Sequence, residues 1–276
     1  MHALTLINET VFKAKRPVND GFVKVVSWYG NDSFIDQMVR VDTDKPRTSS
    51  QITRLINYMI QHKHTSPFEH PHITLHVRMP LALIGQMDKH RTAKYTHKNQ
   101  KSARYEEFPR TPIHVQWKMK ALSGNRQGSG KPASKDTCIM ADDILAQTQT
   151  GYERLKALGI SPEQARFAMV QGTSSEFMMT LSADTLMHML GLRLANEAQR
   201  ELQAFMLVIA DIFNEWLPIT YKAWEKRQNE EEEFTLGDLF QLSMIVAKFD
   251  TVPDRLKDLI ADMYIRKRQA IDDDID

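Results

Sequence analysis

The chain has 276 residues, of which 42% are hydrophobic, so it can form one large domain or two smaller ones around a substantial core. Its formal net charge of +1 excludes a global basic field of the kind that recruits nucleic acid. A single cysteine, Cys138, excludes an internal disulfide framework, and neither a bilayer-spanning stretch nor a signal-peptide core is seen, so we expect a soluble, cytoplasmic protein in a reducing compartment.

Strands and helices are predicted to alternate early in the chain. Residues 22–29 are β-branched and aromatic and partly alternate, which predicts a strand, and Ser33 is placed to cap a short helix after the following turn. Residues 50–62 carry apolar side chains at helical spacing. Between residues 73 and 79 apolar and polar side chains alternate, which is typical of a half-buried strand.

The next segment predicts a binding site for an anion. Pro80 ends the strand and begins a helix that carries Gln86, Lys89 and His90 on one face. The helix leads into a polar loop over residues 89–105, whose cationic side chains suit an anionic ligand. A solvated basic helix end followed by a polar loop is the alternative interpretation.

The second half of the chain is predicted to be mostly helical. Residues 120–137 are rich in glycine and serine and predict a mobile loop, which is either a lid or a tolerated surface insertion. A helix is expected from about residue 140 to 158, and one long helix from 183 to 216. The charged tail leads us to divide the chain into a domain at 1–220 and a helical C-terminal extension at 221–276.

Three segments, taken together and in this order, resemble the flavin-dependent thymidylate synthases. The first, His64–His70, is similar to the family's His-x-(Ser/Thr)-Pro-Phe-Glu-His segment. The second is Lys89-His90-Arg91 followed by Ser102-Ala103-Arg104-Tyr105, which resembles the family's Arg-His-Arg signature and the Ser-x-Arg-Tyr that follows it. The third, Leu192-Arg193 with Ala198–Leu202, resembles its Leu-Arg…Ala-Gln-x-Glu-Ile segment.

The resemblance covers roughly residues 20–220 and implies both a fold and a reaction. The implied fold is of the α/β class (α+β type), with a twisted, mainly antiparallel sheet and long helices, in a homotetramer. The implied reaction is the methylation of dUMP to dTMP, with methylenetetrahydrofolate as carbon donor, FAD as hydride carrier and NADPH as reductant. The partners implied are a pyrimidine nucleotide, folate and other copies of the chain. The net charge, the hydropathy and the lack of a carboxylate or cysteine to complete a set with the histidines lead us to expect no nucleic acid, membrane or metal.

The resemblance also assigns roles residue by residue. Arg193 matches the arginine that holds the uracil ring and stabilises its negative charge, and Ser102 matches a residue near the reacting base, so these two are the expected catalytic residues. For Arg193 the alternative is an ion pair with Glu197, four residues on. The positions expected to bind dUMP are Gln86, Lys89, Gln100, Ser102, Ala103, Arg104, Arg166 and Arg193. The positions expected to bind FAD are His64, Ser66, Glu69, Lys89, His90, Arg91, Ser182, Asp184 and His188.

Departures from the family pattern keep two alternatives open. Lys89 replaces an arginine and Gln100 replaces a glutamate, while Ser182, Asp184 and His188 stand where asparagine, arginine and asparagine are expected. One alternative is a flavin-dependent relative that methylates or hydroxymethylates another pyrimidine nucleotide, such as dCMP. The other is a non-enzymatic nucleotide-binding protein that has lost FAD.

Overall fold

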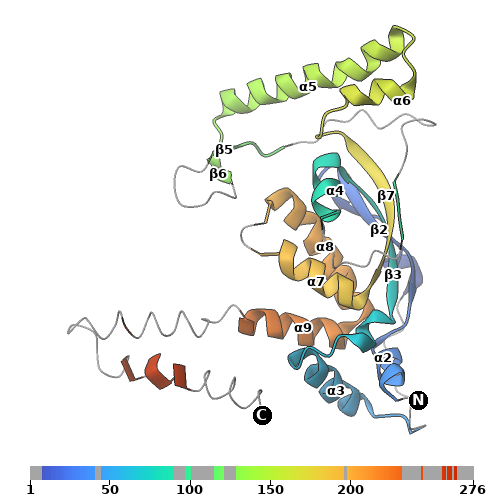
Figure 1. Cartoon of the computed structure of the whole chain (residues 1–276), viewed down its shortest axis with the longest axis vertical. Helices are drawn as coiled ribbons and strands as arrows, with labels where there is room; N and C mark the ends of the chain where they lie inside the picture. The colour runs from blue at the N-terminus through green and yellow to red at the C-terminus, as the bar shows by residue number, and fades with distance from the viewer. Residues whose placement is uncertain are drawn as a thin grey trace. The chain divides into compact units, whose positions relative to one another are not determined.

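The computed structural model describes residues 8–40, 45–89, 97–100, 115–120, 129–195 and 198–231, together with positions 244, 257–258, 260–262 and 264–265. The chain divides into two compact units, residues 1–222 and residues 223–276. Nearly all of the described elements belong to the first unit (Figure 1). No helix within these described residues is both long enough and apolar enough to cross a membrane.

The described strands of the first unit form one sheet in the order β1-β2-β3-β7-β4, with every neighbouring pair antiparallel (Figure 1). The strands predicted at 22–29 and 73–79 are confirmed, and so is the mixed α/β class with a mainly antiparallel sheet. The homotetramer stays a prediction. The strands are β1 (Arg16–Val18), β2 (Gly21–Tyr29), β3 (His72–Pro80), β7 (Ser174–Ser182) and β4 (His97–Gln100).

Three of these strands, β1, β7 and β4, were not predicted from the sequence. Strand β7 runs along the whole of β3, from Ser182 opposite His72 to Ser174 opposite Pro80. Strand β4 pairs with β7 on its other side. The prediction of a polar loop over residues 89–105 is therefore wrong at 97–100, because backbone pairing with β7 makes this polar segment a strand.

One face of the sheet is apolar, and helices pack against it. Helix α8 (Arg200–Trp216) contacts β1 and β2, α7 (Ala183–Arg193) contacts β7, and α4 (Leu81–Met87) contacts β3 (Figure 1). Burying each large apolar side chain stabilises the fold by about 1.5–3 kcal/mol relative to exposure, so this face fixes the three helices on the sheet. The fully buried side chains of β3 are Ile73, Leu75, Val77 and Met79.

The α-helices before β3 begin at capped positions, whereas the 3-10 helix η1 has no side-chain cap. Asn31, rather than the predicted Ser33, caps α2, because its side-chain oxygen accepts the N–H of Phe34 at 2.9 Å. Thr48 and Gln51 form a capping box at the start of α3, which confirms the helix predicted at 50–62. These helices are α1 (Glu9–Phe12), α2 (Asp32–Val39), α3 (Ser49–Gln61) and the 3-10 helix η1 (Ser66–Glu69).

Asp32 is a buried carboxylate that joins two ends of the first unit. Its oxygens accept the backbone N–H groups of Ile219 and Thr220, both at 3.0 Å, and the hydroxyl of Thr220 at 2.6 Å. These donors belong to the first turn of α9 (Pro218–Glu231), so Asp32 satisfies the start of a distant helix. Burial raises the pKa of Asp32 above its ordinary value of 3.8, although the three hydrogen bonds favour the charged form.

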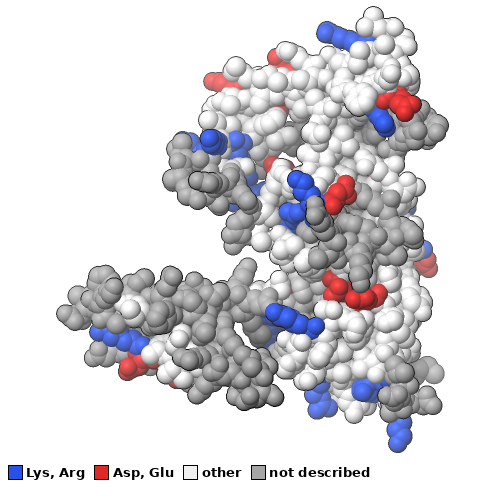
Figure 2. Space-filling model, in the orientation of Figure 1, with Lys and Arg blue, Asp and Glu red and all other residues white. Residues whose placement is uncertain are grey.

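The predicted loop at 120–137 is wrong where the structure describes it. Its described residues contribute to a two-stranded ribbon and to the first turn of a long helix, and residues 121–128 lie outside the described part. The indole N–H of Trp117 donates to Asp142 at 2.7 Å and ties the ribbon to that helix. Figure 2 shows basic side chains over the ribbon and acidic ones along the helix.

The helix predicted from about 140 to 158 is confirmed, but it starts earlier, at Lys135, where Ser134 caps it. It ends near Gly159, whose φ of 84° is the left-handed conformation that glycine adopts without strain. The elements of this part are β5 (Lys118–Lys120), β6 (Ser129–Pro132), α5 (Lys135–Ala157), α6 (Pro162–Ala165) and the 3-10 helix η2 (Arg166–Ala168).

The single long helix predicted from 183 to 216 is wrong. Helix α7 ends at Arg193 and α8 begins at Arg200, so the chain changes direction between them (Figure 1). The side-chain amide of Gln203 donates to the Ala195 carbonyl at 2.6 Å and holds the connection from within α8. This break places the end of α7 and the start of α8 beside α4, where the candidate site lies.

Candidate active site

One face of helix α4 packs into the core, so Gln86 lies at the border between this buried face and the solvent. Leu83, Ile84 and Met87 are buried, which leaves Gln86 half-buried at the edge of the helix. The start of α4 is anchored by two backbone hydrogen bonds of 3.0 Å, from Leu81 and Ala82 to carbonyls in the segment that precedes β7. The sheet and this segment therefore set the position of Gln86.

Arg193 lies in the last turn of α7 and contacts α4 directly. Its Nη2 donates to the backbone carbonyl of Gln86 at 3.0 Å. A cation is also favoured at this place by the partial negative charge of the helix C-terminus. The structure thus brings together two of the positions that were expected to bind dUMP. Glu197, the alternative partner of Arg193, lies outside the described residues.

Gln199 joins the same group from the start of α8. The side-chain Nε2 of Gln86 donates to Oε1 of Gln199 at 2.5 Å. Three elements, α4, α7 and the start of α8, therefore meet through two side-chain hydrogen bonds. Sequence reasoning did not single out Gln199, although it is the Gln of the Ala-Gln-x-Glu segment that carries the resemblance.

Gln100 lies at the end of β4, opposite Phe177 of β7. Its Nε2 donates to the hydroxyl of Ser175 at 3.3 Å, which directs the amide along the sheet edge. Five of the predicted site residues lie outside the described part of the chain, so their positions stay predictions. They are His90, Arg91, Ser102, Ala103 and Arg104.

Arg166 lies on a different element from Gln86 and Arg193. It begins η2, directly after α6, and both of these short helices pack against α5. Its side chain is exposed, and so is that of Phe167, which is 86% exposed. The structure therefore places Arg166 on a surface formed by α5, α6 and η2.

The first group of predicted FAD positions lies on the exposed segment around η1. The His64 ring stacks on Tyr58 of α3, with centroids 6.0 Å apart and ring planes 24° apart. Ser66 and Glu69 at the two ends of η1 are also exposed. Lys89, just after α4, is exposed as well. Imidazole, hydroxyl and ammonium groups at a surface are suitable donors for a phosphate-bearing cofactor with a flat ring.

The second group lies on the first turns of α7, which packs against η1. The backbone N–H of Ala183 donates to the Pro71 carbonyl at 3.0 Å and joins the two segments. Asp184 is half-buried and His188 is exposed on this helix. Ser182 is buried, and its hydroxyl caps α7 by accepting the N–H of Thr185 at 3.2 Å, so it already has a structural role.

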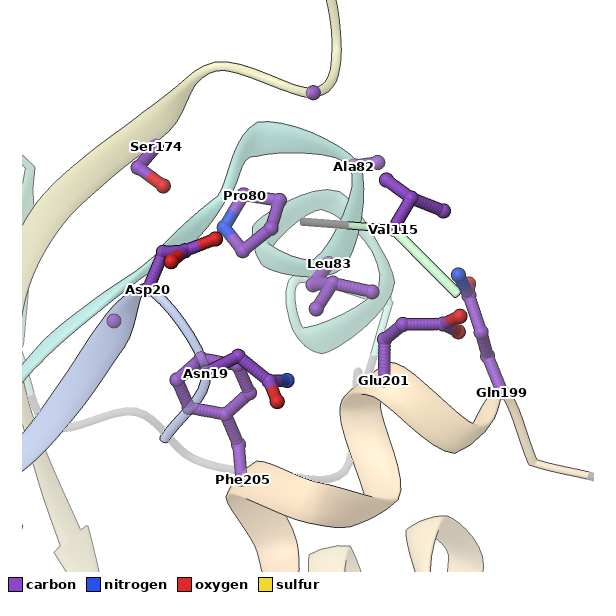
Figure 3. Close-up of a pocket in the computed structure, with 12 residues that line it drawn as sticks. Asn19, Asp20, Pro80, Ala82, Leu83, Val115, Ser174, Gln199, Glu201 and Phe205 are labelled. Atoms are coloured by element: carbon purple, nitrogen blue, oxygen red, sulfur yellow. The ribbon is translucent and has the colours of Figure 1, made fainter. Parts of the chain in front are cut away.

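A cavity of about 120 Å³ lies on the other side of Gln199, between the start of α4, the β1–β2 turn and the first turns of α8 (Figure 3). Figure 3 shows Gln199 and Glu201 at one border and the Phe205 ring at another. Sequence reasoning missed this cavity, because its walls come from five separate parts of the chain. Its lining also includes Asn19, Asp20, Pro80, Leu83, Val115 and Ser174.

These features define a mixed α/β protein with a polar site where three helices meet beside an antiparallel sheet. The family model Thy1, described as thymidylate synthase complementing protein, matches residues 24–219. Because this match covers most of the chain, the protein belongs to the flavin-dependent thymidylate synthase family.

Relatives named flavin-dependent thymidylate synthase agree with this assignment. The protein from Wolbachia pipientis wMel is 32% identical over 228 residues, covering 79% of this chain and 78% of that protein. The protein from Kosmotoga olearia is 31% identical over 218 residues, covering 74% of this chain and 90% of that protein. One from Thermus thermophilus is 32% identical over 213 residues, with coverages of 76% and 78%.

Solved structures share the fold. The UMP/dUMP methylase PolB from Streptomyces cacaoi, bound with 5-Br dUMP, has a TM-score of 0.66 at 24% identity, covering 75% of this chain and 96% of its own. The same methylase bound with 5-Br UMP has a TM-score of 0.65 at 25% identity, with coverages of 75% and 95%.

Proposed function

We propose that this protein methylates dUMP to dTMP, with methylenetetrahydrofolate as the carbon donor and NADPH as the reductant. The observation that carries the proposal is the 3.0 Å bond from Arg193 to the Gln86 carbonyl, which unites two positions expected to bind the nucleotide. Membership of the flavin-dependent thymidylate synthase family supports the same reaction.

In this proposal Arg193 supplies electrostatic activation. A guanidinium held at the uracil ring stabilises the negative charge that develops as N3 ionises, and this makes C5 a better nucleophile. Its bond to the Gln86 carbonyl fixes the cation in place, so little reorganisation is needed in the transition state. No cysteine nucleophile is needed, and Cys138 lies on α5, which carries none of the residues assigned here.

The remaining nucleotide positions act by binding. We assign the Gln86 amide, Gln100, Ser102 and Ala103 to the nucleotide, with Ser102 near the reacting base, and the cations Lys89, Arg104 and Arg166 to its phosphate. Arginine suits phosphate because its planar fork donates two parallel hydrogen bonds. We also infer that copies of the chain assemble into a homotetramer in the cytoplasm and that folate binds beside the nucleotide.

The exposed groups around η1 and α7 fit a flavin nucleotide. His64 can stack on a flat ring, while Ser66, Lys89 and His188 offer donors to phosphate or sugar. His90 and Arg91 are assigned to the same cofactor, with Glu69 and Asp184 beside it. FAD, when bound there, would carry a hydride from NADPH to the transferred carbon. Ser182 contributes by capping α7.

A second candidate is a related reaction on another pyrimidine nucleotide. It is favoured by the fold shared with a methylase described as acting on both UMP and dUMP, and by Gln100, which removes a negative charge from this part of the site. Hydroxymethylation, or a cytosine nucleotide as substrate, belongs to the same candidate.

The test is to identify the product by mass spectrometry. The FAD-loaded protein is incubated with methylenetetrahydrofolate and NADPH and with dUMP, UMP or dCMP in parallel. Thymidylate formed from dUMP alone supports the proposal, and a methylated or hydroxymethylated product from UMP or dCMP supports the second candidate. Bound nucleotide without any product would overturn both and indicate a nucleotide-binding protein without catalysis.

A further inference from the structure

Gln199 is hydrogen-bonded to two residues that we assign to the nucleotide and that lie far apart in the sequence, directly to Gln86 and through it to Arg193. Its Oε1 accepts the amide Nε2 of Gln86 at 2.5 Å, and the backbone of Gln86 in turn holds Arg193 at 3.0 Å. Gln199, Gln86 and Arg193 therefore form one chain of hydrogen bonds across α4, α7 and α8. An amide with one donor fixed in this way has a defined orientation, which leaves its other donor and its oxygen in known directions.

Gln199 does not serve its own helix as a cap. It occupies the N-cap position of α8, but its side chain makes no capping hydrogen bond there. Ser, Thr, Asp and Asn are the usual residues at this position because their short side chains reach the free N–H groups of the first turn. The Gln199 side chain is instead directed to another helix, which points to a role in holding α4 rather than in stabilising α8.

The backbone around Gln199 is held firmly enough for its side chain to act as a fixed support. Its carbonyl accepts the N–H groups of Leu202 at 2.9 Å and Gln203 at 3.0 Å. The side-chain amide of Gln203 donates to the carbonyl of Ala195 at 2.6 Å and so links α8 to the residues that follow α7. The turn between α7 and α8 therefore presents Gln199 at a set place beside α4.

We propose that Gln199 is a positioning residue for nucleotide binding. It orients the Gln86 amide toward the nucleotide and steadies the end of α4, whose carbonyl holds Arg193. The proposal rests on the nucleotide site proposed above and assigns Gln199 no contact with the nucleotide itself. Without Gln199, the Gln86 amide would rotate freely, and part of its binding energy would be lost in ordering it.

The surroundings of Gln199 allow this to be tested cleanly. The cavity beside it leaves room for a side chain of similar size to take another rotamer, so Gln199→Leu should fold normally (Figure 3). A matched control is Gln147→Leu, which removes an exposed glutamine hydrogen bond of 2.7 Å to Asp143 within α5, a helix that carries none of the assigned residues.

The experiment is a double-mutant cycle on dUMP binding, measured by calorimetry with FAD-loaded protein. We expect Gln199→Leu and Gln86→Leu each to raise the dissociation constant of dUMP about 3- to 10-fold, as expected for the loss of one hydrogen bond. The double variant should bind no more weakly than Gln86→Leu alone, because Gln199 acts through Gln86. Gln147→Leu should bind like the wild type, and the melting temperature should be the same in all four variants.

Three outcomes would overturn the proposal. These are effects of Gln199→Leu and Gln86→Leu that simply multiply, wild-type affinity in Gln199→Leu, or an affinity loss accompanied by a matching loss of melting temperature. The proposed function fails separately: a wild-type protein that binds dUMP and shows the coupling but forms no thymidylate would overturn the reaction and leave the positioning role intact. If the wild type forms thymidylate but Gln199→Leu and Gln86→Leu affect dUMP affinity independently, the reaction stands and the positioning role is overturned.

Discussion

The parts of the site that we propose for the nucleotide, the proposed nucleotide side, and for the flavin, the proposed flavin side, are organised differently. On the nucleotide side, Gln86, Arg193 and Gln199 bond to one another across three helices. On the flavin side, the η1 segment and the start of α7 are joined by the backbone bond of Ala183 to Pro71, while His64 and Ser66 face the surface. The comparison indicates that one chain preorganises its nucleotide side and offers its flavin side as a surface on which a cofactor can be held.

The largest effect is expected from removing the cation of the nucleotide side. Arg193→Ala should lower kcat for dUMP methylation by about 10²–10³-fold, the usual cost of losing one preorganised charge donor. The melting temperature should stay near that of the wild type, because Arg193 is half-buried and lies at the end of a helix. Steady-state kinetics and differential scanning fluorimetry measure the two quantities, and wild-type turnover in this variant would refute its role.

The next effect concerns the stability of the fold, through the buried carboxylate of Asp32 that bonds to the start of α9. Asp32→Ala should lower the free energy of unfolding by about 2–4 kcal/mol, because it leaves the donors of Ile219 and Thr220 without their acceptor. Chemical denaturation at neutral pH measures this loss. If α9 were held independently of the sheet domain, the variant would unfold like the wild type.

The same residue predicts a dependence of stability on pH. Burial raises the pKa of Asp32 in the folded protein, so the folded state binds more protons than the unfolded state above pH 3.8. The part of its contribution that is linked to protonation is therefore fully present below the unfolded pKa and is lost as the pH rises through the folded pKa, whereas the charged carboxylate at neutral pH still accepts the hydrogen bonds from Ile219 and Thr220. Asp32→Asn should remove this part of the pH dependence. An unchanged profile in denaturation experiments from pH 4 upward would show that Asp32 does not titrate as described.

A smaller effect should separate the flavin side from the nucleotide side. His64→Ala should raise the dissociation constant of FAD about 2- to 10-fold, the range expected from one lost ring-stacking contact. Its affinity for dUMP, measured without FAD, should be unchanged, since His64 lies on a different segment from Gln86 and Arg193. Fluorescence titration of FAD and calorimetry of dUMP give the two constants, and a parallel loss of both would show that the two sides are one unit.

The smallest effect on FAD binding is expected from Tyr58, whose ring stacks on that of His64. Tyr58→Leu should weaken FAD binding by no more than about 3-fold, because Tyr58 supports the His64 ring from α3 and is not itself assigned to the cofactor. If Tyr58→Leu instead weakened FAD more than His64→Ala did, Tyr58 would be the primary contact. The same fluorescence titration distinguishes the two orders.

Sequence patterns predicted the elements whose signal is local. The alternation over 73–79 and the helical spacing over 50–62 led to β3 and α3, since burial on one face leaves a regular trace in the sequence. Strand β7 was missed because Met178 is apolar but 39% exposed, which blurs its alternation. Strand β4 is polar throughout and is a strand only because β7 lies beside it.

The break between α7 and α8 illustrates why part of the site could not be predicted. Apolar residues continue at helical spacing from Leu190 through Leu194 and Ala198 to Leu202, and no glycine or proline follows Arg193 in this stretch to mark the end of a helix. The break is stabilised by a tertiary contact, Gln203 to the Ala195 carbonyl, which no periodicity records. The resemblance identified Gln86 and Arg193 as site residues. The hydrogen bond between Gln86 and Gln199 could not be predicted, because it joins two helices that come together only in the folded chain.

The most direct test of the whole account follows the flavin absorption without oxygen. The protein is titrated with FAD and reduced with NADPH, and dUMP and methylenetetrahydrofolate are then added together. The account predicts that the absorption of oxidised flavin is bleached by NADPH and recovers only when both substrates are present, with one thymidylate formed for each flavin reoxidised. Flavin that stays reduced after both substrates are added, or protein that does not bind FAD, would contradict it.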